Sequence, residues 1–326
     1  MTRIVFLDIP ENAGRDLDIE RRILGPDVDI AHVAFTGDDT EIVSLCAAAN
    51  VIVTDFVPFT RTTIEKLNNC ELIAVAATGF NSIDVAAAAD NGINVCAIDE
   101  YCTDEVADHA VLLMLALSRR LTEYHAQVQQ DRSWRFDSLT GLRRMSDQTL
   151  GIIGFGRIGQ AVARRAVGFG MQVLAFDPYP SEEAASALGA ELCDLAELYA
   201  RADIVSLNCG LSAATERLVD AAAFAAMSRK PFLINCARGG LVDEEALVAA
   251  LDGGQISGAG LDVLEAESPD LDNSGLTGRH NVILTPHVAF YSDASMRENR
   301  EITAGNIRNF LDGEHARVRK YIHRVA

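Results

Sequence analysis

The chain has 326 residues, enough for two domains with separate hydrophobic cores, and 49% of them are hydrophobic, as in a globular protein. Its formal net charge of -19 argues against nucleic acid and anionic membranes as partners, because both present phosphates that require basic patches on the protein. No stretch approaches the roughly 20 consecutive apolar residues of a membrane helix, and the opening MTRIVFLDIP is typical of a first strand and not of a secretion signal.

In the first hundred residues, short apolar runs alternate with alanine-rich helical segments. We expect strands at 4–8, 51–54, 72–76 and 93–96, and helices at 41–49, 61–69 and 84–91 between them. This alternation predicts a parallel sheet with helices on both faces. This part has no glycine-rich phosphate-binding motif, so we expect it to bind the substrate and not the dinucleotide.

A long helical stretch follows, from residue 103 to residue 130. Thr103 is the expected N-cap, Asp104 and Glu105 lie in the first turn, and apolar residues recur at helical spacing. His109 lies on the apolar face, where a histidine is more often a hydrogen-bonded core residue than a catalytic one. We expect 120–147, with its aromatic and arginine side chains, to form a dimerisation arm, and a surface loop is the alternative.

The segment 149–177 combines an apolar strand, a glycine-rich turn and a helix. In its G-x-G-x-x-G pattern, Gly154 permits the tight turn, Gly156 lets a pyrophosphate approach, and Gly159 lets the helix pack against its strand. The helix N-terminus presents N–H groups and a partial positive charge to the diphosphate. Asp177 ends the next strand, where its carboxylate can bind the adenosine ribose diol and repel a 2'-phosphate. The segment predicts a dinucleotide site that favours NAD over NADP.

The alternation continues with strands expected at 150–153, 173–176, 204–207, 232–236, 258–263 and 282–285, and a helix at 292–311 that returns to the first part. Six strands with helical crossovers predict a doubly wound sheet. The expected fold is therefore α/β, with two Rossmann-like or flavodoxin-like domains and an active-site cleft between them. We assign 1–100 and 291–326 to the substrate domain and 101–290 to the NAD-binding domain.

Three polar residues follow strands of the second part. Arg238, Glu267 and His287 come after the strands expected at 232–236, 258–263 and 282–285. Ligands of such sheets bind at the carboxyl ends of the strands, so these side chains should meet at the edge that carries the glycine turn. Histidine can exchange a proton near neutral pH, a carboxylate can hold its tautomer, and arginine matches a carboxylate in a planar, bidentate way. Beside a nicotinamide, this set predicts hydride transfer to a 2-oxo acid.

Over nearly its whole length the sequence resembles the NAD-dependent D-2-hydroxyacid dehydrogenases. The resemblance rests on the segments TLGIIGFGRIG, NCARGGLVDEEAL, LDV with the glutamate and proline that follow it, and TPHVA. It is closest to the branch that contains the C-terminal binding proteins, through AFDPY, SLNCGL and HVAFYS. The family implies an oxidoreductase that moves a hydride between NAD(H) and a small 2-oxo acid or D-2-hydroxy acid, and a homodimer joined through the coenzyme domain.

The resemblance also implies a role for each matching position. Arg238 would bind the substrate, Glu267 and His287 would handle the proton, and backbone amides around Thr78 and Gly79 would cradle the substrate carboxylate. Apart from the resemblance, the position of Tyr101 lets it either line the pocket or serve only in packing. The implied cofactor contacts are Gly154, Gly156, Arg157, Ile158 and Gly159 at the pyrophosphate, Asp177 at the ribose, Cys209 near the adenosine, and Ala237, Asp262 and His287 around the nicotinamide. No metal is expected.

The sequence departs from the family pattern at three places. The usual Glu-Pro is Glu267-Ser-Pro here, and Glu265 close by leaves the choice of glutamate open, although the spacing from Asp262 favours Glu267. Val75 stands where relatives often have a basic residue, and Phe290 replaces a tryptophan of the nearest branch. Both changes favour a pocket that does not hold a second anionic group tightly.

The sequence is also compatible with two other functions. One is an NAD(H)-sensing, corepressor-like binding protein, and the other is a dehydrogenase specific for D-3-phosphoglycerate or for glyoxylate and hydroxypyruvate.

The seven cysteines are scattered without CxxC pairs, several of them within apolar runs. This pattern predicts reduced thiols and a cytoplasmic location.

Overall fold

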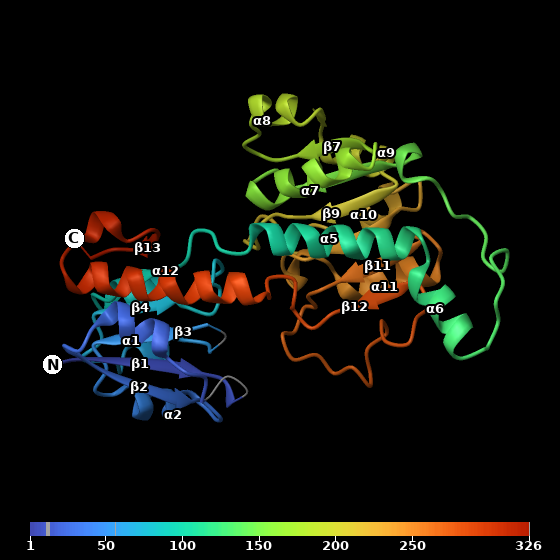
Figure 1. Ribbon diagram of the computed structural model, residues 1–326. Helices are drawn as coiled ribbons and strands as arrows, with labels where there is room; N and C mark the ends of the chain where they lie inside the picture. The colour runs from blue at the N-terminus through green and yellow to red at the C-terminus, as the bar shows by residue number, and fades with distance from the viewer. Residues whose placement is uncertain (11–13, 56, 326) are drawn as a thin grey trace. The chain divides into compact units, whose positions relative to one another are not determined.

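The computed structural model describes residues 1–10, 14–55 and 57–325. The chain divides into two compact units, which are described separately (Figure 1). Unit 1 consists of Met1–Tyr101 and Ser292–Ala326, and unit 2 consists of Cys102–Tyr291. In this described part of the chain, no helix is both long enough and apolar enough to cross a membrane.

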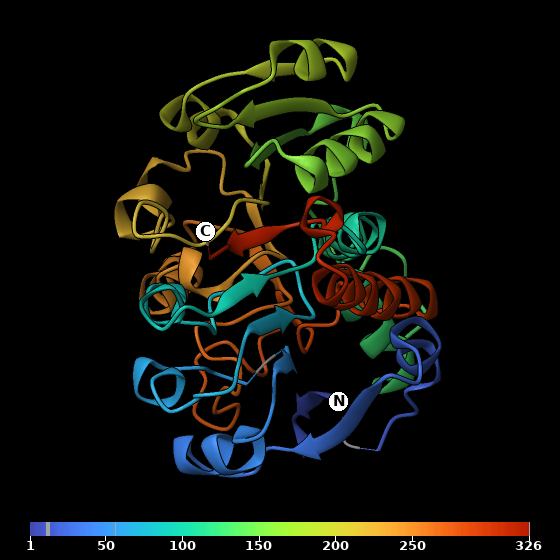
Figure 2. The ribbon, with the colours of Figure 1, turned by 90° about the vertical axis from the view of Figure 1, so that its left-hand side faces the viewer.

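Unit 1 contains a six-stranded sheet in the order β13-β5-β4-β3-β1-β2. Its strands are β1 (Thr2–Asp8), β2 (Val28–Ala34), β3 (Val51–Thr54), β4 (Leu72–Val75), β5 (Asn94–Cys96) and β13 (Tyr321–His323). All neighbours are parallel except β13, which pairs antiparallel with β5 and lies beside it in Figure 2. β2 and β13 were not predicted from the sequence, and the expectation of a parallel sheet was wrong at the β13 edge.

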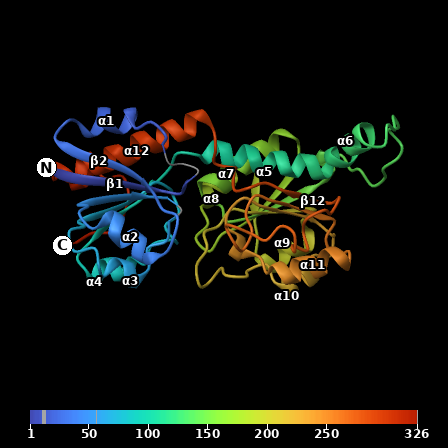
Figure 3. The same ribbon diagram turned by 90° about the horizontal axis from the view of Figure 1, so that it is seen from below.

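Helices cover both faces of the unit 1 sheet, as predicted. They are α1 (Asp18–Leu24), α2 (Asp39–Cys46), α3 (Arg61–Ile64), α4 (Val85–Asp90) and α12 (Asp293–Leu311), with a short 3-10 turn, η4 (His315–Arg317). Alternate residues of β1 point to opposite faces. Ile4 and Phe6 pack with residues of α1 and α12, whereas Val5 and Leu7 pack with residues of α2, α3 and α4. Figure 3 shows these two helical layers.

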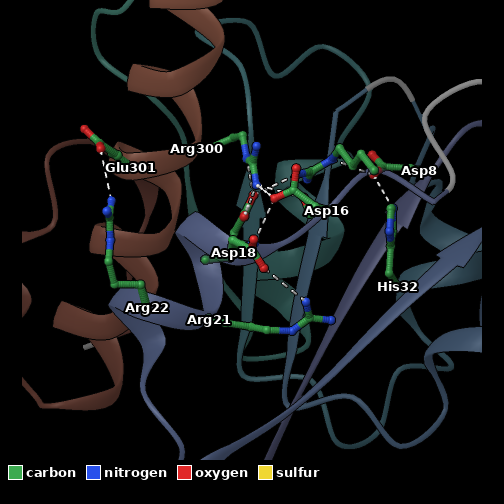
Figure 4. A network of polar contacts seen from close by, with 10 residues as sticks. Asp8, Asp16, Asp18, Arg21, Arg22, His32, Arg300 and Glu301 are labelled. Atoms are coloured by element: carbon green, nitrogen blue, oxygen red, sulfur yellow. Dashed lines mark hydrogen bonds and ion pairs between the residues drawn. The ribbon is translucent and has the colours of Figure 1, made fainter.

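A buried carboxylate links α1 to α12. Glu20 is 1% exposed and accepts hydrogen bonds from Arg15 at 2.7 Å and from Arg300 at 2.9 and 2.7 Å. Arg300 also reaches Asp16 (Figure 4). The buried charge is therefore paired by two guanidinium groups, as burial of an ionised group requires.

Unit 2 contains a seven-stranded parallel sheet in the order β12-β11-β10-β9-β6-β7-β8. Its strands are β6 (Thr149–Ile153), β7 (Gln172–Phe176), β8 (Ala190–Leu192), β9 (Ile204–Leu207), β10 (Phe232–Asn235), β11 (Gly258–Leu261) and β12 (Val282–Leu284). The expected six strands are present, and β8 is an additional edge strand. β7 lies on one side of β6 in the sheet, and β9, which comes later in the chain, lies on the other side. The order of strands thus reverses at β6, where doubly wound sheets bind ligands.

The helices of unit 2 also form two layers (Figure 3). They are α5 (Thr103–Ser118), α6 (Leu121–Gln129), α7 (Arg157–Gly168), α8 (Glu182–Ala187), α9 (Leu195–Arg201), α10 (Ala221–Ala226) and α11 (Glu244–Asp252), with 3-10 turns η2 (Met145–Asp147) and η3 (Gly239–Leu241). The expected helix 103–130 is two helices, because Arg120 has a left-handed φ of 49°. Thr103 is the first helical residue and Cys102 is the N-cap, so that prediction was wrong by one residue.

Candidate active site

The turn between β6 and α7 has the close packing that its glycines predict. Gly154 has a φ of 93°, and a Cβ there would lie 2.6 Å from the Cys209 nitrogen. A Cβ on Gly159 would overlap the Gly154 carbonyl oxygen, so the helix can approach the turn only without a side chain. A Cβ on Gly156 would instead meet nothing within 4 Å. The side of the turn at Gly156 is thus open, and no side chain caps α7 there, as a diphosphate site at a helix N-terminus requires.

Asp177 lies beside this turn, immediately after β7. One carboxylate oxygen accepts a 2.8 Å hydrogen bond from the Phe155 N–H and the other a 2.8 Å bond from the Tyr179 N–H. A carboxylate can accept about four hydrogen bonds, so these two leave acceptor capacity for a ribose diol. Cys209, after β9, borders the same turn, and burial raises the pKa of its thiol. These features fit a dinucleotide.

Arg238 follows β10 in extended backbone at the start of η3. Its Nη1 donates to the Ala237 carbonyl at 2.6 Å, and its own carbonyl accepts from Asn235 Nδ2 at 2.9 Å. The next residue, Gly239, packs so closely on the Leu264 backbone that a Cβ would overlap it. This contact brings the segment after β10 against the segment after β11, which leads to Glu267.

His287 and Glu267 form a direct pair at the same sheet edge. His287 Nδ1 lies 2.8 Å from Glu267 Oε2, with the side chains 25% and 58% exposed. The hydrogen bond from His287 lowers the pKa of Glu267, burial opposes this effect, and the charges of His287 and Arg238 add to it. Glu265 instead accepts a hydrogen bond from Arg217 at 3.2 Å. The geometry therefore selects Glu267, and not Glu265, as the partner of His287.

Comparison with known proteins shows the family to which the chain belongs. Residues 111–289 match the family model described as D-isomer specific 2-hydroxyacid dehydrogenase, NAD binding domain. The chain belongs to this family. It is 35% identical to a glycerate dehydrogenase of Methylorubrum extorquens over 96% of this chain and 97% of that protein. It is 39% identical to a D-3-phosphoglycerate dehydrogenase of Methanocaldococcus jannaschii over 78% of this chain and 48% of that protein.

A solved structure gives the same result for the fold. The crystal structure of a D-lactate dehydrogenase from Aquifex aeolicus, complexed with NAD and lactic acid, matches with a TM-score of 0.87. The two chains are 29% identical, and the match covers 98% of each. The protein is thus an NAD-dependent 2-hydroxyacid dehydrogenase that acts on a CH–OH donor. The family and the cofactor predicted from the sequence are confirmed.

A buried polar network in this dehydrogenase holds the loop that carries His287. Asp262 is 1% exposed and accepts from Thr285 Oγ1 at 2.6 Å and from the backbone N–H groups of Val288 and Ala289, both at 2.9 Å. The His287 N–H donates to the Asp262 carbonyl at 2.7 Å. These bonds fix His287 in a left-handed conformation with a φ of 50°, which a non-glycine residue adopts only when its surroundings impose it.

Helix α5 adds His109 to this network of the dehydrogenase. His109 Nε2 lies 3.0 Å from Thr285 Oγ1. Because the single Thr285 hydroxyl proton is directed at Asp262, His109 must donate from Nε2. His109 is therefore a hydrogen-bonded residue beneath the loop, as predicted. Thr285 was not predicted to be part of the site, although the TPH segment contains it.

Three predicted substrate residues belong to unit 1 of the dehydrogenase. Thr78 and Gly79 lie in the loop that follows β4, and Tyr101 is buried after β5. Arg238, Glu267, His287 and the cofactor residues all belong to unit 2. Among the residues that the structure describes, no group of three or more His, Cys, Asp or Glu side chains is arranged to hold a metal ion.

Proposed function

We propose that Arg238, Glu267 and His287 carry the substrate and proton chemistry of this dehydrogenase. The observation that supports the proposal most directly is the 2.8 Å hydrogen bond from His287 to Glu267 at the carboxyl edge of the sheet. Because Nδ1 is engaged by the carboxylate, Nε2 is the nitrogen that can pass a proton to the substrate oxygen. Arg238 binds the substrate carboxylate and polarises the carbonyl.

The proposed cofactor contacts are those that the family resemblance implies, and the packing of the glycine turn supports the ones at the pyrophosphate. Gly154, Gly156, Arg157, Ile158 and Gly159 bind the pyrophosphate, Asp177 binds the ribose, Cys209 borders the adenosine, and Ala237, Asp262 and His287 surround the nicotinamide. When bound, NADH supplies the hydride that the side chains of the protein cannot supply. Asp262 comes directly after β11, at the edge of the sheet where the nicotinamide is proposed to bind. Its hydrogen bonds to the loop that carries His287 are compatible with a role at the nicotinamide.

The proposed substrate is a small 2-oxo acid, with Thr78 and Gly79 binding its carboxylate through backbone N–H groups. The likeness to a glycerate dehydrogenase over nearly the full length of both proteins favours a short acid such as hydroxypyruvate or glyoxylate. Val75 and Phe290 support an acid without a second anionic group. A phosphoglycerate substrate, an NAD(H)-sensing binding function and membership of the C-terminal binding protein branch stay as alternatives.

The role of His287 can be tested by replacing it with asparagine. We expect turnover of the best 2-oxo acid to fall by about 100-fold or more, while the affinity for NADH, measured by fluorescence titration, stays nearly unchanged. His280→Asn is the matched control, because His280 is exposed and precedes β12 at the opposite end of the strand. Full turnover by His287→Asn would remove His287 from the mechanism.

We also propose a cytoplasmic homodimer in which the segment 120–147 contacts the partner. Within this segment, Trp134 and Phe136 are 86% and 90% exposed, far more than apolar side chains of their size usually are. Residues 130–144, which follow α6, contain no helix or strand (green in Figure 1). Sedimentation analysis should give a dimer for the wild type and a weaker dimer for Trp134→Ser with Phe136→Ser. Tyr179→Ser is the control, because Tyr179 is 91% exposed outside this segment.

A further inference from the structure

Lys320 lies at the ligand edge of the unit 1 sheet for a topological reason. It immediately precedes β13, the strand that runs antiparallel to β5. An antiparallel strand begins where its parallel neighbours end, so Lys320 is placed at the carboxyl ends of β5 and β4. A backbone hydrogen bond fixes this position, because the Ala97 N–H, just after β5, donates to the Lys320 carbonyl at 3.0 Å. Ligands of open α/β sheets bind at this edge.

The side chain of Lys320 extends over the loop 76–80, which we call the substrate loop. Its ammonium donates to the Thr78 carbonyl oxygen at 3.1 Å and lies 5.4 Å from the centre of the Phe80 ring. The first contact is a charge-assisted hydrogen bond and the second is a cation–π contact. Lys320 is half-buried, whereas the two other lysines of the sequence, Lys66 and Lys230, are exposed. Of the three lysines, Lys320 alone therefore has a half-buried side chain.

The hydrogen bond from Lys320 to the Thr78 carbonyl also orients the N–H of Gly79. A trans peptide is planar, and its C=O and N–H point in opposite directions. When Lys320 holds the Thr78 carbonyl, the N–H of the same peptide unit, that of Gly79, is directed to the other side of the loop. That N–H is one of the two groups assigned to the substrate carboxylate.

The positive charge of Lys320 also favours the binding of an anionic substrate. The protein carries a formal net charge of -19, which disfavours the approach of an anionic substrate. A cation adjoining the substrate loop counters this effect locally, and partial burial reduces its screening by salt. Val75, on the strand that leads into the loop, offers no charge for this purpose.

We propose that Lys320 is a positioning residue for carboxylate binding. Its ammonium fixes the orientation of the Thr78–Gly79 peptide and supplies positive charge beside the site where the acid binds. This inference rests on the proposed function, in which Thr78 and Gly79 bind the carboxylate.

The test compares Lys320→Met, which keeps most of the length of the side chain but removes its ammonium group, with Lys320→Arg, which keeps a cation and donors. For Lys320→Met we expect the KM of the 2-oxo acid to rise about 10-fold, with kcat changed by less than about 2-fold. Lys320→Arg should recover much of the affinity. Lys230→Met is the control for loss of one positive charge at a surface position and should leave the KM within about 2-fold of the wild type.

Calorimetric titration with oxamate, an unreactive analogue of a 2-oxo acid, in the presence of NADH separates binding from turnover. We expect Lys320→Met to weaken oxamate binding about 10-fold and to leave NADH binding unchanged. Equal oxamate affinity in a folded Lys320→Met variant and the wild type would overturn the role of Lys320 alone. If the wild type neither binds oxamate nor reduces any 2-oxo acid, the proposed function itself is wrong, and the role of Lys320 with it.

Discussion

At the scale of single residues, the conformation of His287 is maintained by groups that do not themselves carry out the reaction. Its left-handed backbone is energetically unfavourable, and Asp262 offsets that cost through four hydrogen bonds to residues 285–289, one of them accepted by its backbone carbonyl. Thr285 connects this carboxylate to His109 on α5. The orientation of the imidazole therefore depends on a buried network as well as on Glu267.

Thr285→Val tests this network with little change in side-chain shape. The substitution removes the hydroxyl that bridges His109 and Asp262, and leaves a buried carboxylate with one donor fewer. We expect the free energy of unfolding to fall by about 1–3 kcal/mol and kcat to fall by about 10-fold. Urea denaturation and steady-state kinetics provide the measurements. Thr277→Val, at an exposed position of the same unit, is the control; equal kcat and stability in the two variants would show that the network does not support His287.

Glu267→Gln tests how the carboxylate acts on His287. The lowered pKa of Glu267 keeps this carboxyl ionised well below neutral pH, so its negative charge is present throughout the working range. Glutamine can still accept the hydrogen bond but has no negative charge, so it stabilises an imidazolium less than the carboxylate does. Reduction requires the imidazolium as proton donor, so the alkaline limb of the kcat profile should move to lower pH in the variant.

The control for that experiment is Glu265→Gln. Glu265 is a neighbouring carboxylate that pairs with Arg217 and does not contact His287. Its replacement should leave the pH profile in place. Superimposable profiles for Glu267→Gln and the wild type would mean that Glu267 does not tune the proton donor.

Candidate site residues that follow parallel strands can be predicted from the sequence. Contacts that form only when distant elements pack together cannot. Arg238, Glu267 and His287 could be proposed as site residues because each follows a strand, and the carboxyl ends of parallel strands share one edge. His109 was correctly taken as a hydrogen-bonded residue, but its partner Thr285 could not be named, because the contact exists only when α5 packs beneath the loop. Lys320 was overlooked because it precedes an antiparallel strand.

At the scale of elements, the buried carboxylate of Glu20 connects α1 and α12 through its arginine partners. Burial alone would raise the pKa of its carboxyl, but the hydrogen bonds from Arg300 and Arg15 outweigh this effect and lower the pKa below the ordinary value of 4.5. A carboxyl with a lower pKa in the folded state stabilises the fold above its unfolded-state pKa. That contribution is lost as the pH falls through the folded-state pKa.

Glu20→Gln should therefore lower the free energy of unfolding at pH 7 by about 3 kcal/mol, since it leaves two arginines without their buried partner. The difference from the wild type should shrink as the pH is lowered below about 4. The control is Glu301→Gln, which breaks the exposed pair with Arg22 between the same two helices (Figure 4). It should cost less than about 1 kcal/mol. Equal losses in both variants at pH 7 would contradict the special role of the buried carboxylate.

The elements missed by the sequence analysis are those with weak local signals. β2 is an edge strand in which six of seven residues are only partly buried, so its residues do not form a continuous apolar run. β8 and β13 are three-residue edge strands defined by their partners. The break between α5 and α6 occurs at Arg120, a residue type that rarely adopts a left-handed backbone and gives no warning in the sequence.

At the scale of the whole molecule, two α/β units were predictable because each central strand is a short, continuous apolar run between helices. The buried strands β3, β4, β6 and β9 all match their expected positions within one residue. The glycine turn further identified unit 2 as the part that binds NAD. The side chain of the substrate could not be predicted, because it is selected by loops whose shape depends on tertiary packing.

The central claim is that this protein reduces 2-oxo acids with NADH to D-2-hydroxy acids. The most direct measurement incubates the wild type with NADH, and separately with NADPH, and a panel of glyoxylate, hydroxypyruvate, pyruvate and longer-chain 2-oxo acids, followed by chiral analysis of the products. We predict NADH consumption with at least one acid, a preference for NADH over NADPH because of Asp177, and a D product wherever the product is chiral. No turnover with any acid, or an L product, would contradict the account.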